Sequence, residues 1–125
     1  MGKELRVFGL AMLLGGGQAF ATEMGNDGNA LITNCESLLR IVDARKDDNS
    51  LGAGYCVGMM HGVRSAMRVT ADMLPPSEKS CVPHGISNGQ TIRVVLKWLK
   101  DNPTQLDLDA GLLTYRALKE SYPCR

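Results

Sequence analysis

The residues of this sequence with the most distinctive chemistry are its cysteines. There are four of them: Cys35, Cys56, Cys81 and Cys124. Zinc sites usually draw on close pairs such as C-x₂-C, and thiol redox centres use C-x-x-C. Successive cysteines here are 21, 25 and 43 positions apart, and His61 and His84 complete no standard metal-ligand spacing. We therefore expect structural disulfides, with neither a metal site nor a cofactor.

Side chains that could take part in catalysis are present but isolated. No serine lies in the glycine-flanked context of a nucleophile elbow. The adjacent carboxylates Asp47 and Asp48 are typical of a solvated turn, and Asp107 and Asp109 are typical of a helix start. The methionines favour a role in the core over a copper site. The sequence therefore predicts that the protein is not an enzyme.

The first 21 residues have the features of a cleavable export signal. Basic residues occur within residues 1–6, an apolar run covers 7–14, and Ala19 and Ala21 occupy the positions that a signal peptidase recognises. The apolar run is shorter than the roughly 20 residues of a transmembrane helix. A buried N-terminal helix is the alternative, but three consecutive glycines would interrupt it. We expect cleavage after Ala21, a single domain over 22–125, a periplasmic location and no membrane anchor.

The predicted mature chain carries no net charge. Cleavage would remove two basic residues and one acidic residue, which leaves 12 of each sign. Binding that depends on bulk charge, to nucleic acid or to an anionic membrane surface, is therefore not expected. Disulfides persist in oxidising compartments outside the cytoplasm, so the cysteines agree with the export signal.

Apolar residues recur with helical spacing through most of this mature chain. After a flexible leader over 22–29, the pattern predicts helices over about 30–44, 51–74, 87–101 and 108–122. Ser87 and Gln90 form a capping box at the start of the third helix. The loop over 75–85 is expected to lack secondary structure. No segment alternates with period two, so the predicted fold is all-α, a compact bundle of four main helices stapled by two disulfides.

Three glycines recur at every fourth position of the second predicted helix. They are Gly54, Gly58 and Gly62. Each costs a helix about 1 kcal/mol relative to alanine, so their presence on one face calls for an explanation. Small residues let the backbones of two helices approach closely. We expect close helix packing at these glycines in preference to a break in the helix.

Four cysteines allow three disulfide pairings, and the sequence alone does not choose among them. If the third and fourth helices run antiparallel, the end of the fourth returns to the start of the third. Cys124 then lies close to Cys81, which leaves Cys35 and Cys56 as the second pair. Packed helices can supply the short Cα–Cα separation that each bond needs. We therefore expect the disulfides 81–124 and 35–56.

Several short motifs, taken in order, resemble one protein family. Tyr55–Val63 is similar to its aromatic-Cys-x-Gly-x-x-x-Gly helix, and Cys81–Pro83 is similar to its Cys-x-Pro segment. Trp98–Pro103 stands at the family's leucine…His-Pro stretch, with Asn102 where histidine is common. Tyr122–Cys124 matches its aromatic-Pro-Cys ending. The family is that of the type VI amidase immunity (Tai/Rap-like) proteins.

This resemblance covers about residues 32–124 and implies both a fold and a function. Members are small helical, disulfide-bonded periplasmic proteins, commonly homodimers. They protect a bacterium from injected peptidoglycan amidases by binding the toxin and blocking its active-site groove. The resemblance implies that this chain is an immunity protein, that its partner is a cognate amidase toxin, and that it forms a homodimer.

Two other functions are compatible with the sequence. A small exported helical protein can act as a periplasmic chaperone or stress protein, and it can also be an accessory subunit of an envelope complex. A neighbouring gene for a small amidase would favour immunity. An envelope-stress operon would favour one of the alternatives.

Two regions are candidates for the partner-binding surface. The first is the loop over 75–85, which contains three prolines and a cysteine and offers Glu78, Lys79 and His84 for contacts. The second is a face of the third helix, where basic residues are spaced at i, i+4 and i+7 with a tryptophan nearby: Arg93, Lys97, Lys100 and Trp98. A basic helix face is usually only solvated, but tryptophan and arginine are enriched at binding hot spots.

Overall fold

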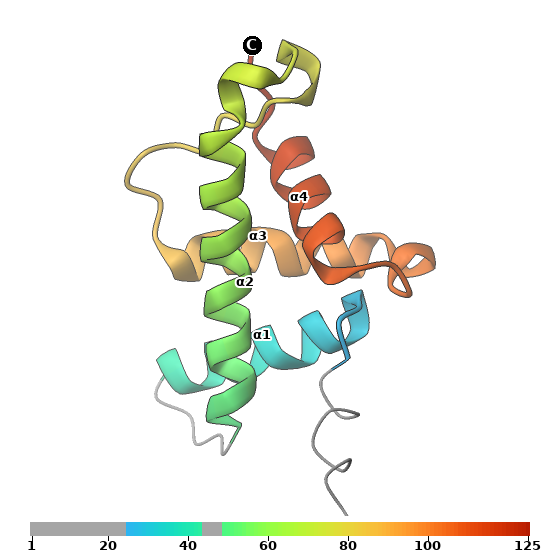
Figure 1. Ribbon diagram of the computed structural model, residues 1–125. Helices are drawn as coiled ribbons and strands as arrows, with labels where there is room; N and C mark the ends of the chain where they lie inside the picture. Colours follow the sequence, from blue (N-terminus) through green and yellow to red (C-terminus); the bar gives the residue numbers. More distant parts are fainter. Residues whose placement is uncertain (1–24, 44–48) are drawn as a thin grey trace, which may run out of the picture.

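The computed structural model describes residues 25–43 and 49–125, and these form an all-α domain without strands (Figure 1). The four main helices are α1 (Gly28–Val42), α2 (Ser50–Val69), α3 (Asn88–Asp101) and α4 (Ala110–Ser121). Three single 3₁₀ turns connect them: η1 (Ala71–Met73), η2 (Pro76–Glu78) and η3 (Pro103–Gln105). The predicted fold class is confirmed. The predicted export signal lies outside the described residues.

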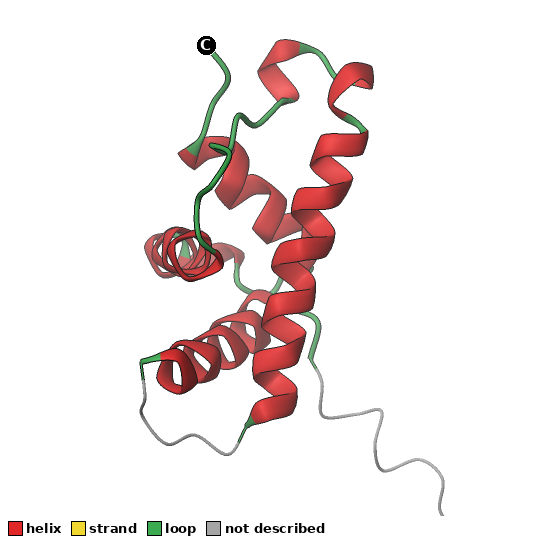
Figure 2. Cartoon of the chain, turned by 90° about the vertical axis from the view of Figure 1, so that its left-hand side faces the viewer, coloured by secondary structure: helices red, strands yellow, loops and turns green. Residues whose placement is uncertain are grey.

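Helix α2 is the longest of the four main helices and contacts the other three. Figure 2 shows α1 and α3 nearly end-on and stacked on the same side of α2. Helix α4 starts near α3 and rises beside α2 toward the C-terminal end of α2 (Figure 1). One face of α2 therefore packs on the other three helices, and the opposite face has no described element beside it.

Each main helix begins at a side chain that caps its first turn. Asp27 accepts from the amide of Ala30 at 2.8 Å and Asn49 accepts from Gly52 at 2.9 Å. Ser87 accepts from Gln90 at 3.1 Å, which confirms the predicted start of α3. Asp109 accepts from Leu112 at 2.9 Å. These short polar side chains satisfy amides that have no partner within a helix.

Helix α2 ends five residues earlier than the sequence pattern predicts. The Thr70 amide and hydroxyl both donate to the carbonyl of Ala66, at 3.0 and 2.8 Å. The chain then turns through η1, and Leu74 adopts an extended conformation before Pro75. Proline disfavours the helical conformation of the residue before it, so the helix ends ahead of the first proline.

The leader predicted to be flexible is partly ordered. The Ala110 amide donates to the carbonyl of Asn26 at 2.9 Å, and the Gly28 amide donates to the carbonyl of Leu106 at 2.9 Å. A Cβ on Gly28 would lie 3.0 Å from the Leu106 backbone, so only glycine allows this approach. These bonds fix the start of α1 against the start of α4.

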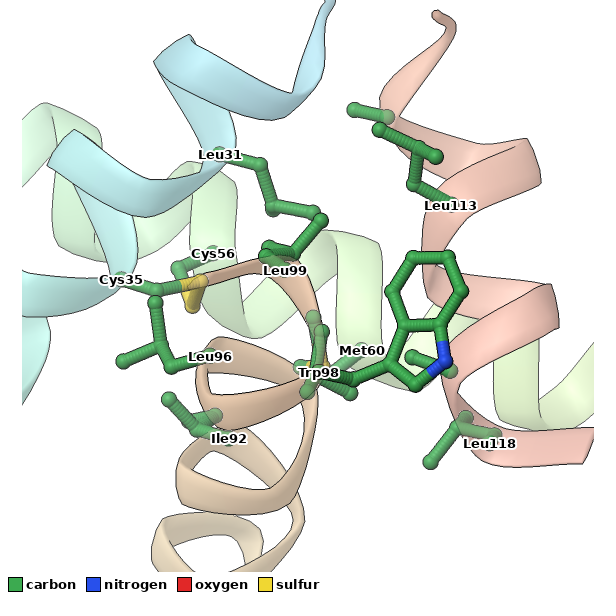
Figure 3. Close-up of a cluster of buried hydrophobic side chains, with 13 residues drawn as sticks. Leu31, Cys35, Cys56, Met60, Ile92, Leu96, Trp98, Leu99, Leu113 and Leu118 are labelled. Carbon is green, nitrogen blue, oxygen red and sulfur yellow. A yellow bond between two sulfur atoms is a disulfide. The ribbon is translucent and has the colours of Figure 1, made fainter. Parts of the chain in front are cut away.

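The core lies where α2, α3 and α4 meet α1 (Figure 3). It is filled by fully buried apolar side chains from all four helices, including Leu31, Cys35, Cys56, Met60, Ile92, Leu99, Leu113 and Leu118. Replacing a buried leucine by alanine in such a core typically costs about 2–5 kcal/mol. The helices are thus held chiefly by packing around the centre of α3.

Both predicted disulfides are present, and the chain has no free cysteine. The Cα atoms are 5.0 Å apart in each pair. The geometric reason given for the 81–124 pair was wrong, because α4 crosses α3 instead of running antiparallel to it (Figures 1 and 2). The chain between α2 and α3 itself reaches back to the end of α4.

Close helix packing was predicted at Gly54, Gly58 and Gly62, but within the single chain no described helix packs there. All three are exposed, and a Cβ added at any of them would meet no atom within 4 Å. Helix α1 packs on the opposite side of α2, where Gly52 and Ala53 are buried. The repeated glycines therefore face outward from the single chain.

Candidate functional site

The segment over 75–86, here named the tethered loop, is held along the end of α4. The Cys81 amide donates to the carbonyl of Tyr122 at 2.7 Å, next to the disulfide with Cys124. The Ser80 hydroxyl donates to the carbonyl of Leu118 at 2.9 Å. The loop was predicted to lack secondary structure, but it begins with the single 3₁₀ turn η2. Covalent and polar contacts thus give it a fixed conformation.

Glu78 anchors this loop to α4 rather than projecting from it. Its carboxylate pairs with Lys119 Nζ at 2.6 Å, and the Tyr115 hydroxyl donates to the Glu78 carbonyl at 2.8 Å. The hydrogen bond and charge of Lys119 lower the pKa of Glu78. The hydrogen bond that Lys119 donates to Glu78 in turn raises the pKa of Lys119. Of the predicted contact residues, Glu78 is therefore the one that ties the start of the loop to α4.

The far side of the tethered loop faces outward. Pro76, Ser77, Pro83 and His84 are exposed, and Lys79 is half-buried. Gly85 has φ 87°, a left-handed conformation that side-chain-bearing residues rarely adopt. The loop thus presents a proline-stiffened surface whose shape is fixed before any partner arrives.

The basic face of α3 is exposed, and each of its cations has a carboxylate partner in the same chain. Arg93 pairs with Asp43 at 3.1 Å and Lys97 pairs with Asp101 at 2.6 Å. Lys100 pairs with Glu36 at 2.6 Å. Exposed pairs of this kind contribute little to stability. A partner that uses these cations must compete with the carboxylates that already hold them.

Trp98 is not part of that exposed face. Only 9% of it is exposed, and its ring lies among core side chains between α3 and α4 (Figure 3). Its Nε1 donates to Glu120 at 2.7 Å. The proposal that Trp98 is a surface contact is therefore corrected. Its spacing of three from Val95 could have shown that it shares the core face of α3.

The sequence interpretation missed a cavity between the second half of α2 and the tethered loop. Its volume is about 390 Å³. Arg64 and Arg68 from α2 line it together with Val82, Pro83 and His84 from the loop. A smaller hollow of about 180 Å³ shares the same two arginines. The spacing of Arg64 and Arg68 at i and i+4 was a signal of a shared basic face.

The outer face of α2 is a second unassigned surface. It carries a shallow apolar hollow of about 420 Å³ lined by Tyr55, Gly58, Met59, Gly62 and Val63. Large apolar side chains are exposed at both ends of the same helix region, Leu51 at 69%, Val69 at 75% and Met73 at 76%. An apolar hollow with exposed apolar side chains beyond its two ends is a candidate interface.

Within the described residues, no three histidine, cysteine or acidic side chains gather as a metal site would require. All four cysteines are bonded. None of the helices over 25–43 and 49–125 is long and apolar enough to cross a bilayer.

A model of the Rap1a immunity proteins matches residues 27–124, nearly all of the described domain. The chain belongs to the Rap1a immunity protein family. No curated protein and no solved structure matches the chain significantly. The match confirms the family that the sequence motifs indicated.

Membership of the Rap1a family indicates what kind of molecule a protein with this tethered loop and helical scaffold would bind. An immunity protein implies binding to a cognate effector toxin. The match begins at Asp27, the cap of α1, and ends at Cys124, the last cysteine. Both disulfides and every helix described above therefore belong to the family domain.

Proposed function

We propose that this Rap1a-family protein is a periplasmic, non-enzymatic inhibitor of a type VI peptidoglycan amidase. The tethered loop blocks the active-site groove of the toxin. The observation that carries the proposal is that this loop is tied to α4 and the residues after it by a disulfide, several hydrogen bonds to backbone carbonyls and an ion pair, while its other side is exposed. Because the loop is already ordered, little conformational entropy is lost on binding.

Lys79 and His84 are the proposed contact residues of the loop, with Glu78 holding them in place. Arg93, Lys97 and Lys100 on α3 are proposed as flanking contacts. Their contribution to affinity should be small because each must exchange one carboxylate for another. The main binding energy is expected from the loop.

A homodimer is the second part of the proposal. A second copy of this chain covers the outer face of α2, with the same face paired about a two-fold axis. A Cβ at any of these glycines would meet no neighbouring atom of the described chain within 4 Å, yet each glycine lowers helix propensity. A crossing α2 of the second copy would use the close approach that these glycines allow. Substitution of Gly58 by leucine should therefore shift the protein toward monomer in sedimentation equilibrium.

Thr104→Leu, at an exposed position away from α2, is the control for that substitution. It adds the same apolar side chain and should leave the association constant unchanged. A wild-type protein that stays monomeric at tens of micromolar would contradict the dimer.

Inhibition is tested with purified type VI peptidoglycan amidases, starting with any amidase encoded beside this gene. The wild-type protein should form a one-to-one complex by calorimetry and stop digestion of peptidoglycan. Ser77→Tyr places a bulky ring on the exposed side of η2 and should weaken inhibition by roughly tenfold or more, a loss typical of a disrupted hot spot.

Thr104→Tyr is the matched control. Thr104 follows a proline in the single 3₁₀ turn η3, as Ser77 does in η2, and both residues are exposed. The control should inhibit like wild type. If Ser77→Tyr also inhibits like wild type, the tethered loop is not the blocking element.

A further inference from the structure

The cavity between α2 and the tethered loop has cationic and apolar walls. Arg64, Arg68 and His84 contribute nitrogen atoms, and Met67, Val82 and Pro83 contribute apolar surface. Among the described residues, no carboxylate lines this cavity or the smaller hollow beside it. The walls are therefore complementary to an anion that carries an apolar stem.

The two arginines differ from the cations of the α3 face and from Lys119 on α4. Arg93, Lys97, Lys100 and Lys119 each pair with a carboxylate: Asp43, Asp101, Glu36 and Glu78 respectively. Arg64 and Arg68 form no ion pair with any described residue. They also lie at i and i+4, where like charges destabilise a helix. Their positive charge is thus uncompensated within the described fold.

Arg64 is incompletely hydrogen-bonded as well. Its Nε is buried and has no partner, and its Nη1 makes only long contacts of 3.4 Å with Asn88 and Thr91. Buried polar groups in folded proteins are nearly always bonded, so the Arg64 guanidinium has unused hydrogen-bonding capacity. A guanidinium presents its donors as a planar fork that fits a carboxylate.

We propose that this cavity is a receptor for a carboxylate side chain, an aspartate or glutamate of the toxin that the tethered loop blocks. The carboxylate pairs with Arg64 and Arg68, and its methylene stem lies on Met67, Val82 and Pro83. This inference rests on the proposed function for the identity of the partner, but the chemistry of the cavity does not depend on it. The cavity volume of about 390 Å³ is ample for one side chain.

The first experiment tests the cavity without any toxin. The purified protein, labelled with ¹⁵N, is titrated with N-acetyl-glutamate amide, and the Nε–H signals of its arginines are followed by NMR. Signals of Arg64 and Arg68 should move, and N-acetyl-glutamine amide, which lacks the charge, should leave them in place. Equal shifts with the neutral probe, or no shifts with the acidic one, would overturn the carboxylate site.

The same titration separates a side-chain receptor from a site for any small anion. Acetate and inorganic phosphate should shift these signals less than N-acetyl-glutamate amide at equal concentration, because neither carries a stem for the apolar wall. If phosphate binds more tightly than the acidic probe, the cavity is a phosphate site and the proposal is wrong.

The second experiment uses the amidase complex. Arg64→Gln and Arg68→Gln should each raise the dissociation constant by roughly 30-fold or more, the usual effect of removing one partner of a desolvated charge pair. Arg116→Gln removes the same charge from α4, where Arg116 bonds Gln105, and should have no effect. Arg68 is exposed, so its substitution leaves the fold intact.

The two experiments distinguish failure of this inference from failure of the proposed function. If Ser77→Tyr abolishes amidase binding while both glutamine variants bind normally, the function stands and the carboxylate receptor is refuted. If no amidase binds but the acidic probe still shifts Arg64 and Arg68, the cavity chemistry stands and the assignment to a toxin is refuted.

Discussion

The two disulfides lie in opposite environments. Cys35 and Cys56 are 1% and 0% exposed and join α1 to α2 within the core. Cys81 is exposed and Cys124 half-buried, and their bond joins the tethered loop to the end of α4. The first bond links helices that already pack on each other. The second fixes a segment that contributes little to the core.

The two disulfides therefore contribute differently to the stability of the fold and to the shape of the proposed binding surface. Chain-entropy models give the two bonds similar contributions through the unfolded state, about 3 kcal/mol for 35–56 and about 4 kcal/mol for 81–124. Their effects in the folded state differ, because only the first is surrounded by core side chains. We infer that the first bond maintains the fold and that the second maintains the shape of the loop.

The largest effect is expected from removing the core disulfide. Cys35→Ala with Cys56→Ala removes the cross-link and leaves a cavity between α1 and α2. The free energy of unfolding should fall by about 3–5 kcal/mol, measured by urea denaturation. A loss below about 1 kcal/mol would contradict the assignment of this bond to the fold.

Removing the loop disulfide should separate binding from folding. Cys81→Ala with Cys124→Ala should lower the unfolding free energy by up to about 4 kcal/mol and keep the helical circular dichroism at 25 °C. Inhibition of the amidase should weaken much more than it would from a shift in the folded fraction, because the loop becomes mobile. Full inhibition by this variant would show that the bond does not shape the contact surface.

Glycines of α2 lie in both packed and open environments, so substitutions within this one helix test the contrast between core and surface. Gly52 lies near the core disulfide, where an added Cβ would overlap the side chains of Asn34 and Asn49 and disturb the cap of α2. Gly52→Ala should destabilise by about 1–2 kcal/mol. Gly58→Ala fills open space and should stabilise the monomer by up to about 1 kcal/mol. Thermal melts at low protein concentration that show the same sign for both would contradict this packing.

The smallest effect concerns pH and the tethered loop. The pKa of Glu78 is lowered by Lys119, so its contribution is full above the ordinary glutamate pKa and is lost as pH falls through the lowered value. The pKa of Lys119 is raised, so its contribution is lost only as pH rises through that raised value. The protection factors of the loop amides, which correct for the pH dependence of intrinsic exchange, should therefore fall on acidification below about pH 4 in wild type.

Glu78→Gln is the control for the pH effect. It removes the titrating group and keeps a hydrogen-bonding side chain, so its loop should show a weaker acid dependence than wild type. The same acid dependence in both proteins would assign the effect to other groups.

Local signals in the sequence predicted most of the fold. The Ser87 capping box fixed the start of α3 because a cap depends on residues three apart. Helix periodicity gave the four helices. The disulfide pairing was predicted correctly, although the antiparallel arrangement of α3 and α4 on which it rested was wrong. The end of α2 was missed because the Thr70 hydroxyl bond and the 3₁₀ turn after it have weaker signals than the prolines.

The incorrect or missing predictions concern surfaces whose exposure depends on which neighbouring elements pack against a helix. The spacing of Gly54, Gly58 and Gly62 shows that a close approach is possible, but not on which side of α2 the neighbours lie. Three helices pack around α3, so fewer of its residues are exposed than predicted, and Trp98 is buried. The cavity was not predicted because Arg64 and the tethered loop are separated in the sequence and come together only in the folded chain.

The central claim, that the tethered loop is the inhibitory surface, is tested most directly by hydrogen–deuterium exchange of the protein with and without its bound amidase. The account predicts that protection on binding is concentrated in peptides covering residues 75–86 and the end of α2 around Arg64 and Arg68. The outer face of α2 near Gly54 should change little. Protection confined to that outer face or to α3, with the loop unchanged, would contradict the account.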